Sequence, residues 1–399
     1  MIGKDIIQKL PSPSFILDEE ELFRSITGFT EALKEFFSDF TLCYSVKTNA
    51  LPYLLNLVHS RDCFAEVVSA DEYHLARQCG YRESRIIYNG PMKNKKTFLE
   101  AVMGGAIVNI ETKRELKWLE ELSKDNIYKV GLRLNINISR VSMEDADGGQ
   151  DNSRFGFSDE TSDFSDALSV IKKLPNVQLS GIHIHRTAHS RSVRFYKHSI
   201  EYACEIIRKY HLELDYLDIG GGFFGIFPEK PTYRDYVCAF REALYGYGLD
   251  TLRVIVEPGN ALVASCFHYL SEVIDVKHVE KEKWFVTTDG SRNDVDPFFR
   301  KQNYLYDLYA EKDSPSVNEQ IVSGCTCLEN DRLFCIKNGP LLQLGDRILY
   351  RNVGAYTMSL SPLFIRFFPC VFAVKKNEII LVRGKWDAEE FLQKSIINN

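Results

Sequence analysis

One lysine ends an apolar stretch rich in strand-forming residues, in the run Leu42-Cys43-Tyr44-Ser45-Val46-Lys47-Thr48-Asn49-Ala50. A leucine and Pro52 follow, which predicts a strand end at Lys47 and a helix soon after. In a parallel α/β barrel, the carboxyl ends of the strands carry the catalytic groups. A lysine there can form a Schiff base if burial and neighbouring charges lower its pKa. Taken alone, Lys47 is explained more simply as a solvated lysine, because most lysines are exposed.

Two histidines alternate on another strand-like run, residues 179–185, so His183 and His185 point to the same face. A buried imidazole needs a partner, and two at a strand end suggest a site. A pair of hydrogen-bonded core histidines is an equal alternative. Metal binding by this pair is not favoured, because no carboxylate or third histidine accompanies it at ligand spacing.

Three glycines, Gly220, Gly221 and Gly222, follow Asp218 after the next strand-like run. Without side chains, their backbone N–H groups can approach an anion such as phosphate, although a tight turn is the alternative. Glu257, followed by Pro258, ends a further run. Its carboxylate could stabilise a cationic ring nitrogen, or form a salt bridge at the strand end.

A later segment carries a thiol that could donate a proton, Cys327, within Gly324-Cys-Thr-Cys-Leu-Glu-Asn-Asp331. A buried structural cysteine is the alternative. Tyr356, two residues after Gly354, supplies a phenol suited to bonding a phosphate, although most such tyrosines only pack.

The elements that must position these residues alternate between short apolar runs and amphipathic helices from about residue 30 to 265. This alternation predicts parallel strands with crossover helices, either a (β/α)8 TIM barrel or an open doubly wound sheet. The strand-like runs are 85–88, 106–110, 130–135, 179–185, 216–219 and 253–257, with helices such as 111–122 and 192–210.

The pattern becomes rich in β-forming residues after about residue 266, which predicts a second, antiparallel domain. The expected strands lie within 269–276, 284–288, 318–323 and 369–374, and Ser14–Asp18 could join them. We therefore expect a barrel over residues 22–266 and a C-terminal β domain over 267–399, with an N-terminal strand from residues 1–21 added to it.

The composition limits the function classes. The 399 residues are 45% hydrophobic and 26% charged, typical of a soluble protein, and the net charge of -6 argues against nucleic acid as a partner. No apolar run is long enough to cross a membrane, and the N-terminus does not resemble a signal peptide. The 10 cysteines lack paired spacing, so we expect reduced thiols, no metal and a cytoplasmic protein.

Considered in order, the motifs resemble those of the fold-type III pyridoxal-phosphate decarboxylases, the group of the diaminopimelate, ornithine and arginine decarboxylases. The resemblance runs from about residue 12 to 373. Its motifs are Tyr44-x-x-Lys47, Glu66-Val-Val-Ser69-x-x-Glu72, Asn109-Ile-Glu111, Ser153-x-Phe-Gly156, His183-x-His185, Asp218-x-Gly-Gly-Gly222, Glu257-Pro-Gly259, Gly324-x-x-Cys327-x-x-x-Asp331, Gly345-Asp346 and Gly354-Ala-Tyr356.

The resemblance implies a TIM barrel, a C-terminal β domain and a head-to-tail homodimer with shared active sites. Lys47 would bind pyridoxal 5'-phosphate covalently, His185 would stack on its ring, and Glu257 would pair with the ring nitrogen. The phosphate would be held by Gly220, Gly221, Gly222 and Tyr356, with Asn260 at a further cofactor position. Cys327 of the partner subunit would be the proton donor, and Glu72, Leu328 and Asp331 would lie near the substrate.

Three departures bear on the substrate and the phosphate. The family's His-x-Gly-Ser reads His185-Arg-Thr-Ala188 here, and its Glu-Pro-Gly-Arg ends in Asn260. We therefore expect Arg186 or Thr187 to compensate. The acidic residue that follows the catalytic cysteine in diaminopimelate and ornithine enzymes is Leu328, and the expected arginine-proline pair reads Asp296-Pro297.

These departures predict decarboxylation of an amino acid or an amino-acid conjugate, as in siderophore or antibiotic pathways. Diaminopimelate decarboxylase is the leading alternative. A racemase is less favoured, because racemases of this fold place an arginine where Glu257 stands. A non-catalytic regulatory homologue is less favoured because Lys47 and Cys327 are both present.

Overall fold

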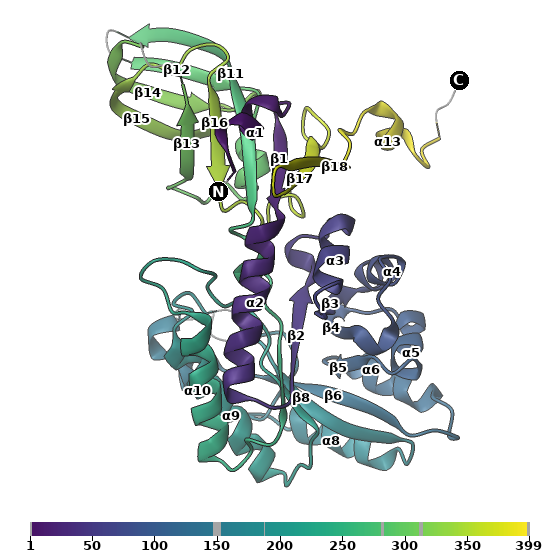
Figure 1. Ribbon diagram of the computed structural model, residues 1–399. Coiled ribbons are helices and arrows are strands. Elements are labelled where there is room, and N and C mark those ends of the chain that lie inside the picture. The colour runs from purple at the N-terminus through teal and green to yellow at the C-terminus, as the bar shows by residue number, and fades with distance from the viewer. Residues whose placement is uncertain (1, 147–152, 187, 281–282, 311–313, 397–399) are drawn as a thin grey trace. The chain divides into compact units, whose positions relative to one another are not determined.

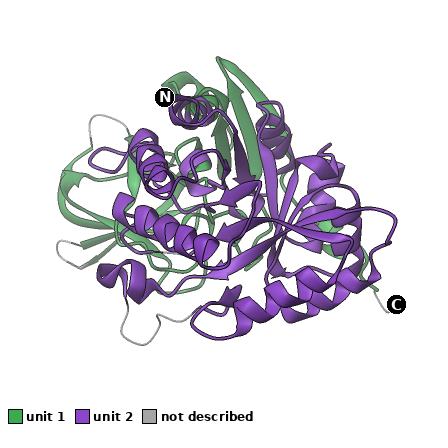
Figure 2. Ribbon diagram, turned by 90° about the horizontal axis from the view of Figure 1, so that it is seen from below, with its two compact units in different colours: residues 1–24, 263–399 green, residues 25–262 purple. Residues whose placement is uncertain are grey.

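The computed structural model describes residues 2–146, 153–186, 188–280, 283–310 and 314–396 (Figure 1). The chain divides into two compact units, residues 25–262 and residues 1–24 together with 263–399 (Figure 2). Among the described residues, none of the helices combines the length and apolar character that crossing a membrane requires.

The unit of residues 25–262 is a closed barrel of parallel strands, so the predicted TIM barrel is confirmed and the open sheet is wrong. Closure comes from two pairings, β5 with β6 and β10 with β2. The eight barrel strands are β2 (Phe40–Ser45), β3 (Phe64–Ser69), β4 (Ile86–Met92), β5 (Ile107–Ile110), β6 (Tyr128–Asn135), β8 (Val177–Ile184), β9 (Tyr216–Asp218) and β10 (Arg253–Val256). A short strand, β7 (Phe157–Ser158), pairs with β6 outside the ring.

Helices follow the barrel strands, and several of them begin at polar caps. The Ser69 side chain accepts a hydrogen bond from the Glu72 amide at the start of α4, and Thr232 forms a capping box with Asp235 at the start of α10. The helices are α2 (Glu19–Phe36), α3 (Pro52–His59), α4 (Ala70–Gln78), α5 (Lys95–Met103), α6 (Lys113–Trp118), α7 (Ile138–Val141), α8 (Asp163–Lys173), α9 (Val193–Lys209), α10 (Tyr233–Gly246) and α11 (Asn260–Val263).

The barrel interior is filled by large side chains for which glycines on neighbouring strands leave room. A Cβ on Gly181 would lie 2.2 Å from the Tyr216 ring, and a Cβ on Gly131 would lie 2.2 Å from its hydroxyl. Tyr216 itself is 5% exposed. Side chains from adjacent strands therefore meet inside the barrel at this level.

Among the described residues, the second unit consists mostly of antiparallel strand pairs, as predicted, together with parallel pairs that were not predicted. β1 pairs antiparallel with β11 and parallel with β17, and β12 pairs parallel with β14. Neither parallel pair is joined by a tight hairpin, because most of the chain separates β1 from β17, and β13 lies between β12 and β14 in sequence. The strands are β1 (Ser14–Asp18), β11 (Phe267–Glu280), β12 (Lys283–Thr288), β13 (Leu305–Tyr309), β14 (Ser316–Ser323), β15 (Arg332–Pro340), β16 (Arg347–Arg351), β17 (Cys370–Lys375) and β18 (Glu378–Arg383). The helices of this unit are α1 (Lys4–Lys9), α12 (Arg292–Val295) and α13 (Ala388–Leu392).

Candidate active site

Lys47 lies just beyond β2, in the 3-10 turn Val46–Thr48 at the carboxyl end of the barrel. Its Nζ donates to Glu66 Oε2 at 2.7 Å and to Ser45 Oγ at 2.8 Å. Ser45 Oγ also donates to Glu66 Oε2, at 2.5 Å. The Lys47 side chain is 35% exposed and that of Glu66 only 2%. A reachable amine is thus held by a buried carboxylate.

Glu66 stays charged because its partners outweigh its burial. Burial raises the pKa of the carboxyl. The charge of Lys47 and the hydrogen bonds from Lys47 and Ser45 lower the pKa by more than burial raises it, so the net pKa is below its usual value. Glu66 was not predicted as a site residue, although it opens one of the quoted motifs. Only the pairing of Ser45 with Glu66 across β2 and β3 reveals the contact.

The two histidines at the end of β8 lie one above the other, with ring centroids 6.4 Å apart and an interplanar angle of 11°. Burial, then the charges of Arg133 and Lys47, lowers the pKa of His185 to about 3, so its ring is neutral at physiological pH. Its Nδ1 accepts a hydrogen bond from the Gly221 amide at 3.2 Å. Arg133, which forms an ion pair with Glu111, donates to the His185 carbonyl. A neutral imidazole held at both ring and backbone presents a fixed aromatic face.

The three glycines form a turn that only glycine can occupy. Gly220 and Gly222 have φ of 73° and 98°. A Cβ on Gly221 would lie 2.2 Å from the Glu257 carbonyl oxygen. The amides of Gly220 and Gly221 already donate to Asp218 Oδ1 and His185 Nδ1. A phosphate bound here would therefore accept hydrogen bonds from the backbone amides that begin at Gly222, or it would replace Asp218 and His185 as the acceptor of the Gly220 and Gly221 amides.

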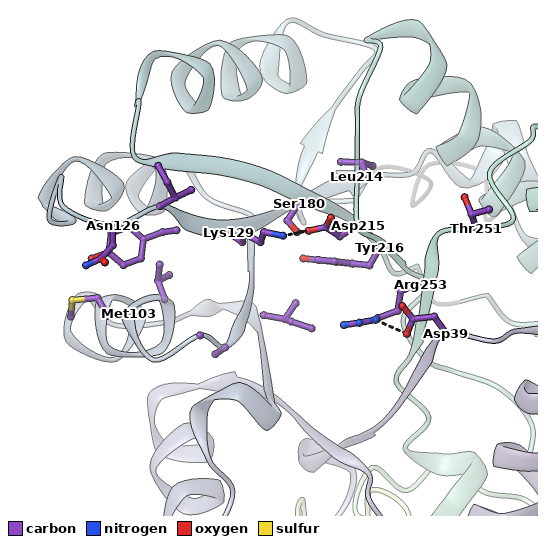
Figure 3. A pocket seen from close by; sticks show the side chains of 16 residues that line it. Asp39, Met103, Asn126, Lys129, Ser180, Leu214, Asp215, Tyr216, Thr251 and Arg253 are labelled. Carbon is purple, nitrogen blue, oxygen red and sulfur yellow. Dashed lines mark hydrogen bonds and ion pairs between the residues drawn. The ribbon is translucent and has the colours of Figure 1, made fainter.

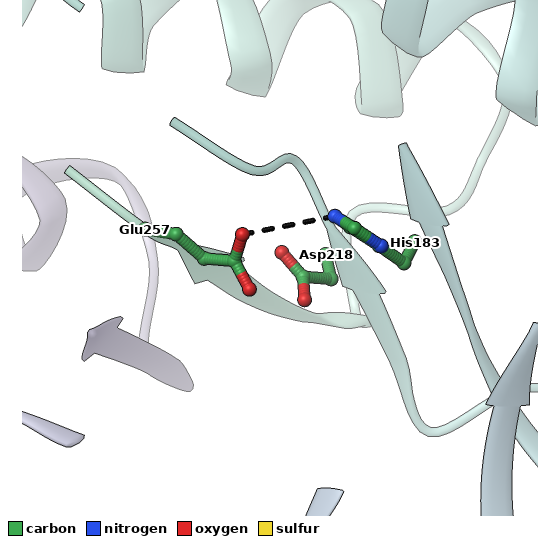
Figure 4. A group of neighbouring side chains, drawn as sticks. All are labelled: His183, Asp218 and Glu257. Carbon is green, nitrogen blue, oxygen red and sulfur yellow. Dashed lines mark ion pairs between the residues drawn. The ribbon is translucent and has the colours of Figure 1, made fainter. Parts of the chain in front are cut away.

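Glu257, Asp218 and His183 form a buried cluster at the same end of the barrel strands (Figure 4). One ligand atom of each lies within 4.8 Å of the others, and His183 Nε2 lies 3.7 Å from Glu257 Oε2. The premise that no carboxylate accompanies His183 is therefore wrong. It failed because the two carboxylates come from other strands, and spacing along one strand cannot reveal them.

The buried group of His183, Asp218 and Glu257 is suited to bind a cation that donates one hydrogen bond. Burial, then the charge of Asp218, raises the pKa of Glu257 well above its usual value, and burial raises that of Asp218 to about 7. Asn89 Nδ2 donates to Glu257 Oε1 at 2.6 Å, and Asn109 Nδ2 donates to Asp218 Oδ2 at 3.1 Å. One nitrogen and two oxygen donors also suit a transition metal. The bonded amides leave Glu257 Oε2 turned toward His183, a geometry suited to a single N–H donor.

Glu72 and Asn260 lie near helix starts in this unit. Glu72 Oε2 accepts from the Val68 amide at 2.8 Å, and the Glu72 amide donates to Ser69 Oγ, the side chain that caps α4. Asn260 begins α11 and is partly exposed. Thr187 lies outside the described residues.

The remaining predicted residues belong to the other unit. Cys327 is exposed, Leu328 is 39% exposed and Tyr356 is 42% exposed. Asp331 is buried, and its carboxylate accepts from Ser291 Oγ, the Arg292 amide and both Thr326 donors. Asp331 thus anchors the loop that carries Cys327, with both of its oxygens already bonded.

A reachable amine, a neutral imidazole face, a buried carboxyl cluster and a glycine turn at one barrel end fit a phosphorylated pyridine aldehyde. Residues 23–264 match the family model of the pyridoxal binding domain of pyridoxal-dependent decarboxylases, so the chain belongs to this family. The family prediction is confirmed, and the protein is a pyridoxal-phosphate-dependent amino-acid decarboxylase.

Known relatives cover nearly the whole chain. A diaminopimelate decarboxylase of Staphylococcus aureus is 24% identical over 394 residues, covering 94% of this chain and 91% of that protein. A probable chloroplastic diaminopimelate decarboxylase of Oryza sativa is 27% identical over 368 residues, covering 88% of this chain and 73% of that protein.

Solved structures share the fold. The diaminopimelate decarboxylase of M. jannaschii has a TM-score of 0.85 at 22% identity, covering 99% of this chain and 94% of that one. The arginine decarboxylase of Paramecium bursaria Chlorella virus has a TM-score of 0.77 at 22% identity, covering 93% of this chain and 98% of that one.

Proposed function

We propose that this decarboxylase acts at the carboxyl end of the barrel, with Lys47, His185 and Glu257 as the residues that bind the cofactor. The observation that carries the proposal is the Lys47–Glu66 contact of 2.7 Å, which orients one amine over the barrel mouth. When bound there, pyridoxal phosphate supplies an electron sink, which accepts the electron pair that remains when the bond between the α-carbon and the carboxylate breaks and CO2 leaves.

Each residue has a separate task in this proposal. Glu66 orients the Lys47 amine, and His185 presents its neutral ring face. Glu257 would hold a proton on the ring nitrogen of the bound cofactor, which would favour decarboxylation because a protonated ring accepts electrons more readily. Cys327 Sγ donates the proton to the carbon that loses CO2, from the partner subunit of a homodimer.

Mixing inactive variants tests the shared site. Lys47→Ala and Cys327→Ala should each lose activity, and refolding them together should restore up to about a quarter of the wild-type rate, because mixed dimers form one intact site. Failure of the mixture to regain activity, with dimers present by light scattering, would contradict a site shared between subunits.

We propose that Arg186 takes part in binding the phosphate in place of the family arginine and serine. Arg186 lines a small cavity together with Gly221 and Tyr196, beside the glycine turn. Arg186→Ala should weaken cofactor retention by about tenfold, the effect of losing one charged hydrogen bond. Arg208→Ala, a change on the exposed end of α9, is the control. If both variants bind pyridoxal phosphate with equal dissociation constants, Arg186 does not take part in binding the phosphate.

Diaminopimelate is the first candidate substrate, because the relatives above that bear this name match this chain over most of their length. An amino acid with a neutral or conjugated tail is the second, favoured by the exposed Leu328 beside Cys327. A leucine at this position cannot form a charged hydrogen bond with a distal amine of the substrate, and such a bond contributes about 1.5–3 kcal/mol to binding.

A panel of substrates decides between them. CO2 release should be measured with diaminopimelate, ornithine, arginine and an amide-linked conjugate, in wild type, Leu328→Glu and Leu328→Gln. If residue 328 faces the distal amine, Leu328→Glu should raise kcat/KM for diaminopimelate about tenfold over Leu328→Gln. Interconversion of enantiomers without CO2 release would establish the racemase instead.

A further inference from the structure

We propose that Tyr216 is a positioning residue for the cofactor ring, acting through Asn109 and Asn89 on the carboxyl groups of Asp218 and Glu257. The inference rests on the proposed function, in which Glu257 holds the proton of the ring nitrogen. Tyr216 begins β9, whereas Glu257 follows β10, and a chain of two asparagine amides joins the two side chains.

The chain runs across the barrel interior in one direction. Tyr216 OH donates to Asn109 Oδ1 at 2.9 Å. Asn109 Nδ2 donates to Asn89 Oδ1 at 2.9 Å and to Asp218 Oδ2 at 3.1 Å. Asn89 Nδ2 donates to Glu257 Oε1 at 2.6 Å and to Glu66 Oε1 at 3.4 Å. The phenol is therefore the first donor of a network that ends on three carboxyl groups.

Donor counting shows why the phenol matters. Each asparagine amide has two hydrogens, and both hydrogens of Asn109 and of Asn89 have an acceptor in this network. If the Asn109 amide were reversed, its oxygen would face Asp218 Oδ2 and Asn89 Oδ1, two acceptors. These two acceptors set the productive orientation of Asn109, and the Tyr216 hydroxyl adds a hydrogen bond to the Asn109 oxygen in that orientation.

Tyr216 is suited to remain a donor and to stay in place. Burial, then the charges of Asp218 and Glu257, raises the pKa of its phenol well above the usual value. Gly131 and Gly181 leave the space that its ring occupies, since a Cβ on either would lie 2.2 Å from Tyr216.

Tyr216 also lies next to a cavity at the opposite end of the barrel strands. Its side chain lines a cavity of about 1070 Å³ where several strands begin (Figure 3). The charged groups of this cavity are paired with one another, Arg253 with Asp39 at 2.8 Å and Lys129 with Asp215 at 2.6 Å. The tyrosine ring thus lies between this cavity and the buried network, and its hydroxyl faces the network.

The test uses the complete protein loaded with pyridoxal phosphate that carries ¹⁵N at the ring nitrogen. Tyr216→Phe removes the hydroxyl and keeps the ring. In this variant, the ¹⁵N chemical shift should show the ring nitrogen losing its proton at a pH about one unit lower than in wild type. The kcat should fall about tenfold, whereas KM should stay within about twofold of wild type. Tyr81→Phe is the matched control, because Tyr81 is also buried and donates only to the Leu55 carbonyl, at 3.2 Å.

Two more variants separate the possible failures. Asn89→Leu removes the donor to Glu257 and should move the ¹⁵N titration in the same direction, even if Tyr216→Phe does not fold. An unchanged titration in folded Tyr216→Phe, or in Asn89→Leu, overturns the positioning role. Glu257→Gln tests the proposed function itself: if its ring nitrogen titrates as in wild type, the assignment of Glu257 fails. If Glu257→Gln shifts and Tyr216→Phe does not, only the present inference fails.

Discussion

Replacing His185 by glutamine should make the cofactor-free protein less sensitive to acid. The folded protein keeps His185 neutral down to a pKa of about 3, against an ordinary value of 6.5, because it is buried and lies near Arg133 and Lys47. Between these pH values the unfolded chain binds one proton more than the folded protein. Stability from this residue is therefore fully present above pH 6.5 and is lost as the pH falls. A glutamine carries no such proton and can still accept from the Gly221 amide.

The size of the effect follows from linkage. One pKa unit corresponds to about 1.4 kcal/mol, so the full shift is worth about 5 kcal/mol below pH 3, and about 2 kcal/mol of it is lost between pH 7 and pH 5. Asp218 has an opposite effect, because its pKa of about 7 makes the folded state bind the extra proton. Since Asp218 is present in both proteins, its contribution cancels in the comparison between wild type and variant.

Urea unfolding at pH 7 and pH 5 measures this difference. The loss of unfolding free energy on acidification should be smaller in His185→Gln than in wild type by about 2 kcal/mol. His74→Gln, at an exposed position on α4, should behave as wild type. Identical losses in wild type and His185→Gln would show that His185 is not held neutral by burial.

Further changes test other parts of the structure. Gly181→Ala should lower the free energy of unfolding by about 1–3 kcal/mol, measured by urea titration, because its Cβ would meet the Tyr216 ring at 2.2 Å. Asp331→Ala should reduce kcat and increase proteolysis of the 324–331 loop, since four hydrogen bonds that hold this loop end on Asp331; unchanged proteolysis would refute this anchoring role. Lys47→Ala should abolish the absorption band of lysine-bound cofactor and should also lower the melting temperature of the cofactor-free protein, because buried Glu66 loses its ion-pair partner. Prolonged treatment with EDTA should leave the decarboxylation rate unchanged if the cluster of His183, Asp218 and Glu257 serves the ring nitrogen; loss of activity, restored by a divalent metal, would assign that cluster to a metal.

Local sequence patterns predicted much of the fold. Alternating apolar runs and amphipathic helices predicted the barrel, and Lys47, His185 and the glycine turn each follow or end a strand, where a barrel places its chemistry. Short-range chemistry also indicated Glu257, because a proline fixes the backbone directly after it. The mixed pairing of the β domain escaped prediction, because β1 lies between β11 and β17, which follow it by hundreds of residues.

The sequence by itself therefore determined the family, the cofactor and the residues that end most of the barrel strands, because these depend on local residue type and order. Only the tertiary structure decided which inward side chains touch. Glu66 reaches Lys47, Asn89 reaches Glu257, and Tyr216 reaches Asn109. Those contacts follow from the register of parallel strands around a closed barrel. A shift of one residue would turn each side chain to the opposite face, and no single strand records that register.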